Sequence, residues 1–197
     1  MTMTSLGVPS PTTPAVSLGS LAVRREAANI VLVRAGLALA RYHLGHDLTG
    51  RTAVVVGAER TGTYAARLLH EAGVGGLSVT SRSQATASEL AAWTGGEPLA
   101  AAGLVDAVSH AEILVAATAA QTSVVLVPEV RLARQNAGGR PLFVLDLGAP
   151  PDVERGVGRL PGVVLVDLRA LGRRLRLGDV PEWISARSRR LEDRVSG

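Results

Sequence analysis

The stretch Thr52-Ala53-Val54-Val55-Val56-Gly57-Ala58-Glu59-Arg60-Thr61-Gly62 decides the fold of this chain. Its first five residues are mostly β-branched and predict a short strand, which ends at a glycine-rich turn. A helical pattern follows from about Thr61 to Ala72, before a second group of glycines. A strand, a glycine-rich turn and a helix in this order are typical of the first unit of a dinucleotide-binding domain.

The rest of the chain repeats this alternation of strands and helices. Strand-like runs occur at residues 77–80, 113–117, 142–145 and 163–166. A helical pattern covers residues 84–94, with Ser83 as its candidate N-cap. The core must be aliphatic, because hydrophobic residues make up 47% of the chain and aromatic residues only 3%. The sequence predicts an α/β fold: a doubly wound parallel sheet of the Rossmann type, with flanking N- and C-terminal helices.

Changes in composition divide the chain into four parts. Residues 1–16 are rich in proline, threonine and serine, and they are predicted to be a disordered leader. Residues 17–46 are predicted to form an N-terminal helix, 47–178 the dinucleotide-binding domain and 179–197 a C-terminal helix. The apolar residues of the N-terminal helix cover more than one stripe, so we expect cover on two sides, from its own domain and from a second subunit.

Composition excludes several kinds of chemistry. The chain has no cysteine, which rules out disulfides, thiolate metal sites and a cysteine nucleophile within these residues. Its four histidines are scattered without ligand spacing, so no metal site is expected. All 21 basic residues are arginine and the net charge is +4, which permits an anionic ligand without requiring one. Because no signal peptide or membrane-length apolar run is visible, we expect a cytoplasmic protein.

The dinucleotide fingerprint is present with one substitution. It uses three glycines, for a tight turn, for close approach of the backbone to the pyrophosphate, and for close packing of the helix on the strand. The first and third are present as Gly57 and Gly62, but the second is replaced by Glu59. A carboxylate at this position would crowd and repel the pyrophosphate at the N-terminus of the helix.

Glu59 leaves two interpretations open. In the first, its side chain swings outward, and Arg60 or the hydroxyls of Thr61 and Thr63 help to hold the phosphate. In the second, the fold persists but the cofactor is lost. In either case, without a ligand we expect the carboxylate to satisfy the amide donors of the helix N-terminus.

The end of the second strand favours NADPH over NADH. Domains specific for NAD place an acidic residue there to bind the ribose hydroxyls. This chain instead has Arg82 between Ser81 and Ser83, and an arginine flanked by hydroxyls suits a 2′-phosphate.

Two later loops complete the predicted site. Small residues at 117–120 and 147–151 leave room for a nicotinamide ring. Asp146 ends its strand nearby, where it would either orient a substrate or cap the following turn. No catalytic acid or base is assigned. The predicted cofactor-binding residues are Gly57, Ala58, Glu59, Arg60, Thr61, Gly62, Ser81, Arg82, Ser83, Thr118, Ala119 and Gly148.

With these segments identified, the chain resembles the NADPH-binding domain of glutamyl-tRNA reductase, an enzyme of tetrapyrrole (porphyrin) biosynthesis. The resemblance covers nearly the whole chain after the leader, and its combination of motifs is specific. The matching segments are residues 15–23, 53–58, 80–83, 117–120, 146–152 and 160–163. The resemblance implies a Rossmann fold, NADPH as cofactor and oxidoreductase activity.

Departures from this family are equally informative. Its members have a catalytic domain with a cysteine nucleophile, the NADPH domain and a helical dimerisation domain. A chain without cysteine cannot form the family's thioester intermediate, so we expect that it is not a complete glutamyl-tRNA reductase. The middle glycine of the family is also replaced, by Glu59.

Two functions follow from the sequence. The first is an NADP(H)-dependent oxidoreductase like glutamyl-tRNA reductase, or the reductase component of a split system in a tetrapyrrole-related or natural-product pathway. Its missing acyl chemistry would come from a protein partner. The alternative is a non-enzymatic pseudo-enzyme that has lost cofactor binding and serves as an interaction or regulatory module.

The expected partners follow from the same features. A homodimer would use the terminal helices, and no membrane contact is expected. RNA binding through arginines is disfavoured, because aromatic residues are not interleaved with them. The arginines in question are Arg169, Arg173, Arg174 and Arg176.

Overall fold

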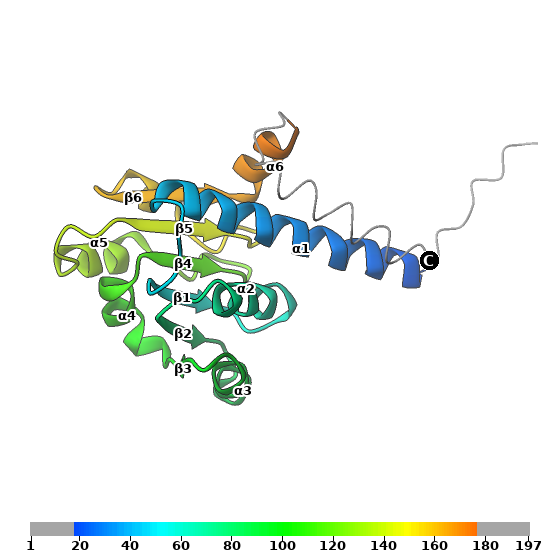
Figure 1. The fold of residues 1–197 in the computed structure, drawn as a ribbon, viewed down its shortest axis with the longest axis horizontal. Helices are drawn as coiled ribbons and strands as arrows, with labels where there is room; N and C mark the ends of the chain where they lie inside the picture. The colour runs from blue at the N-terminus through cyan, green and yellow to red at the C-terminus, as the bar shows by residue number, and fades with distance from the viewer. Residues whose placement is uncertain (1–17, 177–197) are drawn as a thin grey trace, which may run out of the picture.

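The computed structural model describes residues 18–176 of the 197-residue chain (Figure 1). The predicted leader at 1–16 and the predicted C-terminal helix at 179–197 lie outside the described residues. Within the described range, no helix is long and apolar enough to cross a membrane.

Six parallel strands form one sheet in the order β3-β2-β1-β4-β5-β6. The strands are β1 (Thr52–Val56), β2 (Gly76–Thr80), β3 (Glu97–Pro98), β4 (Ile113–Ala116), β5 (Leu142–Asp146) and β6 (Val163–Asp167). The chain builds outward from β1 through β2 to β3, and then returns to the other side of β1 as β4. This strand order is that of a doubly wound Rossmann sheet, so the predicted fold class is confirmed.

Helices cover both faces of this sheet (Figure 1). The α-helices are α1 (Leu18–His43), α2 (Arg60–Glu71), α3 (Gln84–Thr94), α4 (Leu104–His110), α5 (Val127–Gln135) and α6 (Leu168–Arg176). Two 3₁₀ turns, η1 (Ala101–Gly103) and η2 (Arg155–Arg159), complete the elements. Helices α1, α2, α3 and α6 bury one face of the sheet, and α4, α5 and η2 bury the other.

The composition of β1 suits its central position in the sheet. Ala53 and Val55 pack under the α1–α2 face, whereas Val54 and Val56 pack under the α4–α5 face. Successive side chains of a strand point to opposite faces, and here both faces are dry. A run of small and β-branched residues without polar alternation is therefore what this strand requires.

Most element boundaries match the sequence-based predictions closely. The predicted helix at 84–94 is α3, and the Ser83 hydroxyl accepts a hydrogen bond from the Thr86 N–H at 3.3 Å as its N-cap. The strands agree to within one residue at either end. The short strand β3 was not predicted, because two residues carry no periodicity that could identify them.

Helix α1 obtains much of its cover from its own domain. It packs against α2, α6 and β5, and its residues Leu37, Ala38, Leu39 and Ala40 are all buried. Four consecutive buried residues on a helix span its whole circumference, so cover on more than one side is needed. The predicted cover by its own domain is thus found, while the predicted second subunit stays a prediction.

A single arginine ties the end of α1 to the start of the sheet. The Arg51 guanidinium donates to the carbonyl oxygens of Leu44 and Asp47 and forms an ion pair with Glu112, just before β4. The side chains of Arg51 and Glu112 are 25% and 19% exposed. Because the pair is largely shielded from water, we expect it to contribute more than an exposed pair.

We expect Arg51→Ala to lower the free energy of unfolding by about 1.5–3 kcal/mol, because it leaves a half-buried carboxylate and two carbonyl groups without their donor. The exposed Arg131 on α5 provides the control, and Arg131→Ala should change that free energy by less than about 0.5 kcal/mol. Urea denaturation followed by circular dichroism measures both. Equal effects of the two substitutions would contradict the proposed role of Arg51.

Candidate functional site

Four loops converge at the carboxyl edge of the sheet, where the order of strands reverses between β1 and β4. They follow β1, β2, β4 and β5, at residues 57–59, 81–83, 117–120 and 147–152. Ligands of open α/β sheets bind at such a switch point. All twelve predicted cofactor-binding residues lie in these loops or in the first turn of α2.

Two glycines of the fingerprint are required by backbone contacts. Gly57 has a φ of +104°, and a Cβ there would lie 2.8 Å from the carbonyl carbon of Ala117. A Cβ on Gly62 would overlap the Gly57 carbonyl group, at 2.7 Å from its carbon. Any side chain at either position would therefore separate α2 from β1, or β1 from the loop after β4.

Glu59 occupies a position that does not require glycine for backbone reasons. Its φ and ψ of −79° and −177° are extended, and any residue adopts this conformation. Glu59 is the N-cap residue of α2, but its side chain makes no capping hydrogen bond. The expectation that this carboxylate satisfies the amides of the helix N-terminus in the absence of a ligand is therefore wrong, because the side chain has another partner.

That partner is Arg82, in the loop after β2. Glu59 Oε1 lies 3.0 Å from Arg82 Nη2, and the side chains are 56% and 78% exposed. The ion pair bridges the glycine turn and the neighbouring loop over the carboxyl ends of β1 and β2. Sequence reasoning assigned the two residues to separate roles and missed their contact. Their opposite charges on loops after adjacent strands were the available signal.

The loops after β4 and β5 are held together by Asp152. Its carboxylate is fully buried and accepts hydrogen bonds from the Thr118 N–H at 2.6 Å and from the Thr118 hydroxyl. Gly148 packs directly against it, since a Cβ on Gly148 would lie 2.8 Å from the Asp152 nitrogen. Asp152 was not among the predicted site residues, yet it positions two of them, Thr118 and Gly148.

Asp146 caps the loop that follows β5. One carboxylate oxygen accepts from the N–H groups of Gly148 at 2.9 Å and Asp152 at 3.2 Å, and the other accepts from Val153 at 3.1 Å. Of the two roles considered for Asp146, the structure shows the capping role. Burial raises the pKa of Asp146, the three backbone hydrogen bonds oppose that rise, and repulsion from Asp152 adds to it.

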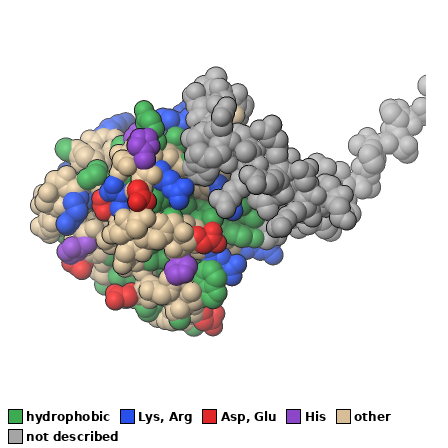
Figure 2. Space-filling model, viewed as in Figure 1, with side chains coloured by type: hydrophobic (Ala, Val, Ile, Leu, Met, Phe, Trp, Pro, Cys, Tyr) green, Lys and Arg blue, Asp and Glu red, His purple; other side chains and the backbone are tan. Residues whose placement is uncertain are grey.

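The remaining predicted residues differ in exposure. Arg60, Ser83 and Ala119 are exposed, Thr61 and Ser81 are half-buried, and Ala58 is buried. Among the described residues, no group of three or more histidine, aspartate and glutamate side chains could hold a metal ion. On the face drawn in Figure 2, basic side chains are interspersed with acidic ones over the described surface.

Comparison with known proteins places this geometry in context. Residues 38–173 match the family model described as shikimate / quinate 5-dehydrogenase. The glutamyl-tRNA reductase of Desulforudis audaxviator is 38% identical over 137 residues, which cover 70% of this chain and 30% of that protein. The chain thus spans about a third of the length of the curated relatives it matches.

Solved structures agree with this assignment. The glutamyl-tRNA reductase from Methanopyrus kandleri superposes with a TM-score of 0.65 at 29% identity, over 89% of this chain and 47% of that chain. The nucleotide-binding domain of the same enzyme from Thermoplasma volcanium has a TM-score of 0.53 at 16% identity, covering 76% and 93% of the two chains, and shows a shared fold. The predicted resemblance to the nucleotide-binding domain of glutamyl-tRNA reductase is confirmed.

The contact between Gly62 and Gly57 can be tested with a matched glycine. Gly62→Ala should lower the free energy of unfolding by at least about 2 kcal/mol, because the added methyl group meets backbone that cannot move independently. Gly76→Ala is the control, since a Cβ there would lie at an ordinary 3.5 Å from the Thr52 side chain. It should leave the free energy unchanged to within about 1 kcal/mol. Comparable losses, measured by urea denaturation, would refute the packing argument.

The raised pKa of Asp146 predicts a pH dependence of stability. As the pH rises, the unfolded chain releases this proton before the folded protein does. The contribution to stability is therefore present at low pH and is lost as the pH rises from the ordinary aspartate range through the raised value. The free energy of unfolding of the unmodified protein relative to Asp146→Asn should fall over this range. A difference that is constant or increases with pH would contradict this sign.

Proposed function

The chain belongs to the shikimate / quinate 5-dehydrogenase family, and we propose that it is an NADPH-binding oxidoreductase domain of the glutamyl-tRNA reductase type. The choice of NADPH rests on Arg82. This arginine follows β2, at the position where NAD-specific domains have an acidic residue. Arg82 lies beside the glycine turn, within reach of a group bound there.

The N-terminus of α2 is suited to the pyrophosphate. The N-cap residue of this helix makes no side-chain capping hydrogen bond to the first-turn N–H groups. The Glu59 side chain points to Arg82 rather than across these amides. Free amides and the positive end of the helix dipole favour an anion at this position. This arrangement supports the interpretation in which Glu59 is turned outward and cofactor binding is retained.

Arg82 and its two neighbours are suited to a 2′-phosphate. The guanidinium is mostly exposed and offers further N–H donors besides the one paired with Glu59. Ser81 and Ser83 flank it, and the Ser83 hydroxyl still has its own proton to donate while its oxygen caps α3. Charge-assisted hydrogen bonds from an arginine to phosphate are among the strongest in proteins.

The loops after β4 and β5 would receive the nicotinamide end. When bound, NADPH supplies a hydride, and the protein's task is to orient the ring and exclude water. Thr118 is held in place by the buried Asp152, and the neighbouring Ala119 and Gly148 carry only small side chains or none. Asp146 has both carboxylate oxygens engaged by backbone N–H groups, so we assign it no part in proton transfer.

The proposed substrate is an activated acyl group, such as the glutamyl group from which the relatives take their name. The 197 residues contain no cysteine, so a thiol that accepts the acyl group must belong to residues outside them. We propose that a protein partner supplies it, as the second component of a split reductase in a tetrapyrrole-related or natural-product pathway of the cytoplasm.

Titration with NADPH and NADH tests the cofactor assignment. We expect NADPH to bind more tightly, and Arg82→Ala to weaken NADPH by about 10- to 100-fold, because it removes hydrogen bonds to a charged group. The affinity for NADH should fall by less than about threefold, because NADH has no 2′-phosphate for Arg82 to contact. The exposed Arg131 on α5 again provides the control, and Arg131→Ala should leave both affinities unchanged.

One outcome would favour the alternative function. If neither cofactor bound until Glu59 was replaced by glycine, the oxidoreductase proposal would fail. The chain would then be better described as an interaction or regulatory module on a Rossmann scaffold.

A further inference from the structure

We propose that Glu59 is an internal competitor for the cofactor: in the free protein its carboxylate occupies the place on Arg82 that the 2′-phosphate takes on binding. This inference rests on the proposed function and concerns how the same site is regulated. It predicts that NADP(H) binds by exchange. The ion pair opens, the Arg82 guanidinium binds the 2′-phosphate and the Glu59 carboxylate becomes solvated.

The position of the ion pair carries this inference. Glu59 is the N-cap residue of α2, where the pyrophosphate of a dinucleotide is expected, and Arg82 follows β2, where the adenosine ribose is expected. A contact at 3.0 Å between these two side chains therefore spans the place where the adenosine half lies. Backbone strain does not explain why Glu59 is turned this way, because its φ and ψ are unstrained.

The chemistry of the two anions makes the exchange feasible. A carboxylate offers one negative charge and two oxygens, whereas a phosphate monoester carries nearly two charges and three oxygens. Both side chains of the ion pair are more than half exposed, so water and salt screen their attraction. An exposed pair of this kind is weak, so a phosphate can displace it, and it lowers the affinity by no more than the few-fold that such pairs contribute.

The effect of Glu59 has two parts that differ between ligands. Its charge near the N-terminus of α2 disfavours every anionic ligand of the glycine turn. Its ion pair with Arg82 weakens the binding only of ligands that have a 2′-phosphate. The pair 2′,5′-ADP and 5′-AMP separates these parts, because the two compounds differ only in the 2′-phosphate.

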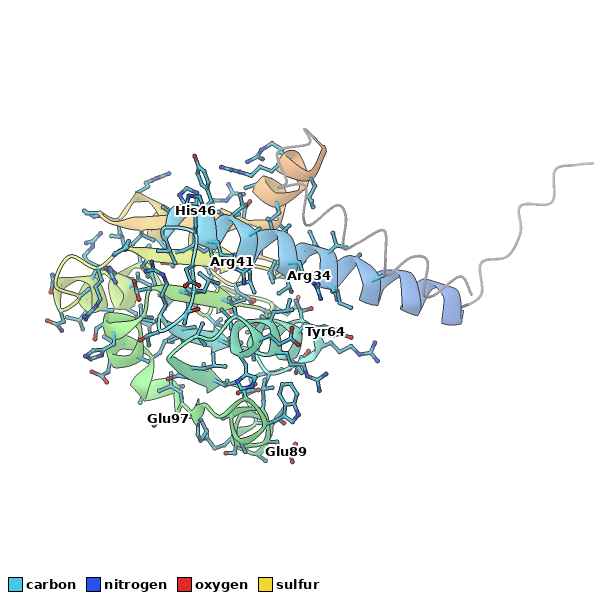
Figure 3. All side chains as sticks on the ribbon, viewed as in Figure 1. Arg34, Arg41, His46, Tyr64, Glu89 and Glu97 are labelled. Atoms are coloured by element: carbon cyan, nitrogen blue, oxygen red, sulfur yellow. The ribbon has the colours of Figure 1, made fainter. Side chains whose placement is uncertain are left out.

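Four proteins and these two ligands make the test: the unmodified chain, Glu59→Gln, Arg82→Gln and the double variant, each titrated by calorimetry. Glu59→Gln should tighten 2′,5′-ADP by a factor about two to five larger than it tightens 5′-AMP, the range that exposed ion pairs contribute. This excess should disappear in the Arg82→Gln background, because the guanidinium for which Glu59 and the 2′-phosphate compete is then absent. Glu89→Gln is the control, since Glu89 lies on the outer side of α3, away from the glycine turn (Figure 3).

Four outcomes would overturn the proposal. Equal tightening of both ligands would mean that Glu59 acts only by its charge near the helix. Weaker binding of 5′-AMP to Glu59→Gln would mean that the carboxylate holds the ribose hydroxyls instead. If NADPH and 2′,5′-ADP bound to none of the variants, the proposed function would fail together with this inference. Tight NADPH binding without the excess would refute the competition alone.

Discussion

The contact of backbone with backbone at Gly57 and Gly62 is the constraint on which the rest of the site depends. With no side chain at either position, α2 packs against the end of β1, and β1 lies against the loop after β4. This contact directs the free N–H groups of α2 toward the point where the strand order reverses. The pairing of β1 with β2 brings the loop after β2 beside this turn, where Arg82 contacts Glu59. The sterically required glycines thus determine where every other group of the site can be.

Within this frame, the three glycines of the fingerprint separate into two kinds. The first and third are required by contacts inside the protein, so a side chain at either position would destabilise the fold. The second is demanded only by an approaching ligand, because the backbone at Glu59 is extended and unstrained. A side chain at that position therefore changes binding without changing the fold. This distinction is consistent with a chain that keeps the fold of its relatives, and under the proposed function Glu59 and Arg82 would adjust its affinity for a dinucleotide.

The parts of the structure with strong local signals could be predicted from the sequence, and those set by long-range contacts could not. The β-branched run before Gly57 and the Ser83 cap identified β1 and α3 closely, because propensity and capping act within a few residues. The ion pair between Glu59 and Arg82 and the buried Asp152 depend on loops that are distant in sequence. Only the strand order brings these loops together, and a single sequence does not state which loops will touch.

The buried carboxylates at this edge have structural roles, which limits the part they can play in the proposed reaction. Asp146 and Asp152 are the buried acidic side chains among the described residues, and both are fully engaged in holding the loops after β4 and β5. A carboxylate whose oxygens already accept backbone N–H groups is poorly placed to accept a proton from a substrate as well. The same hydrogen bonds restrain the two loops, and under the proposed function this would suit a surface that orients a flat ring. Under the proposed function, the described residues would position the cofactor, and groups outside them would supply the acid–base and acyl-transfer chemistry.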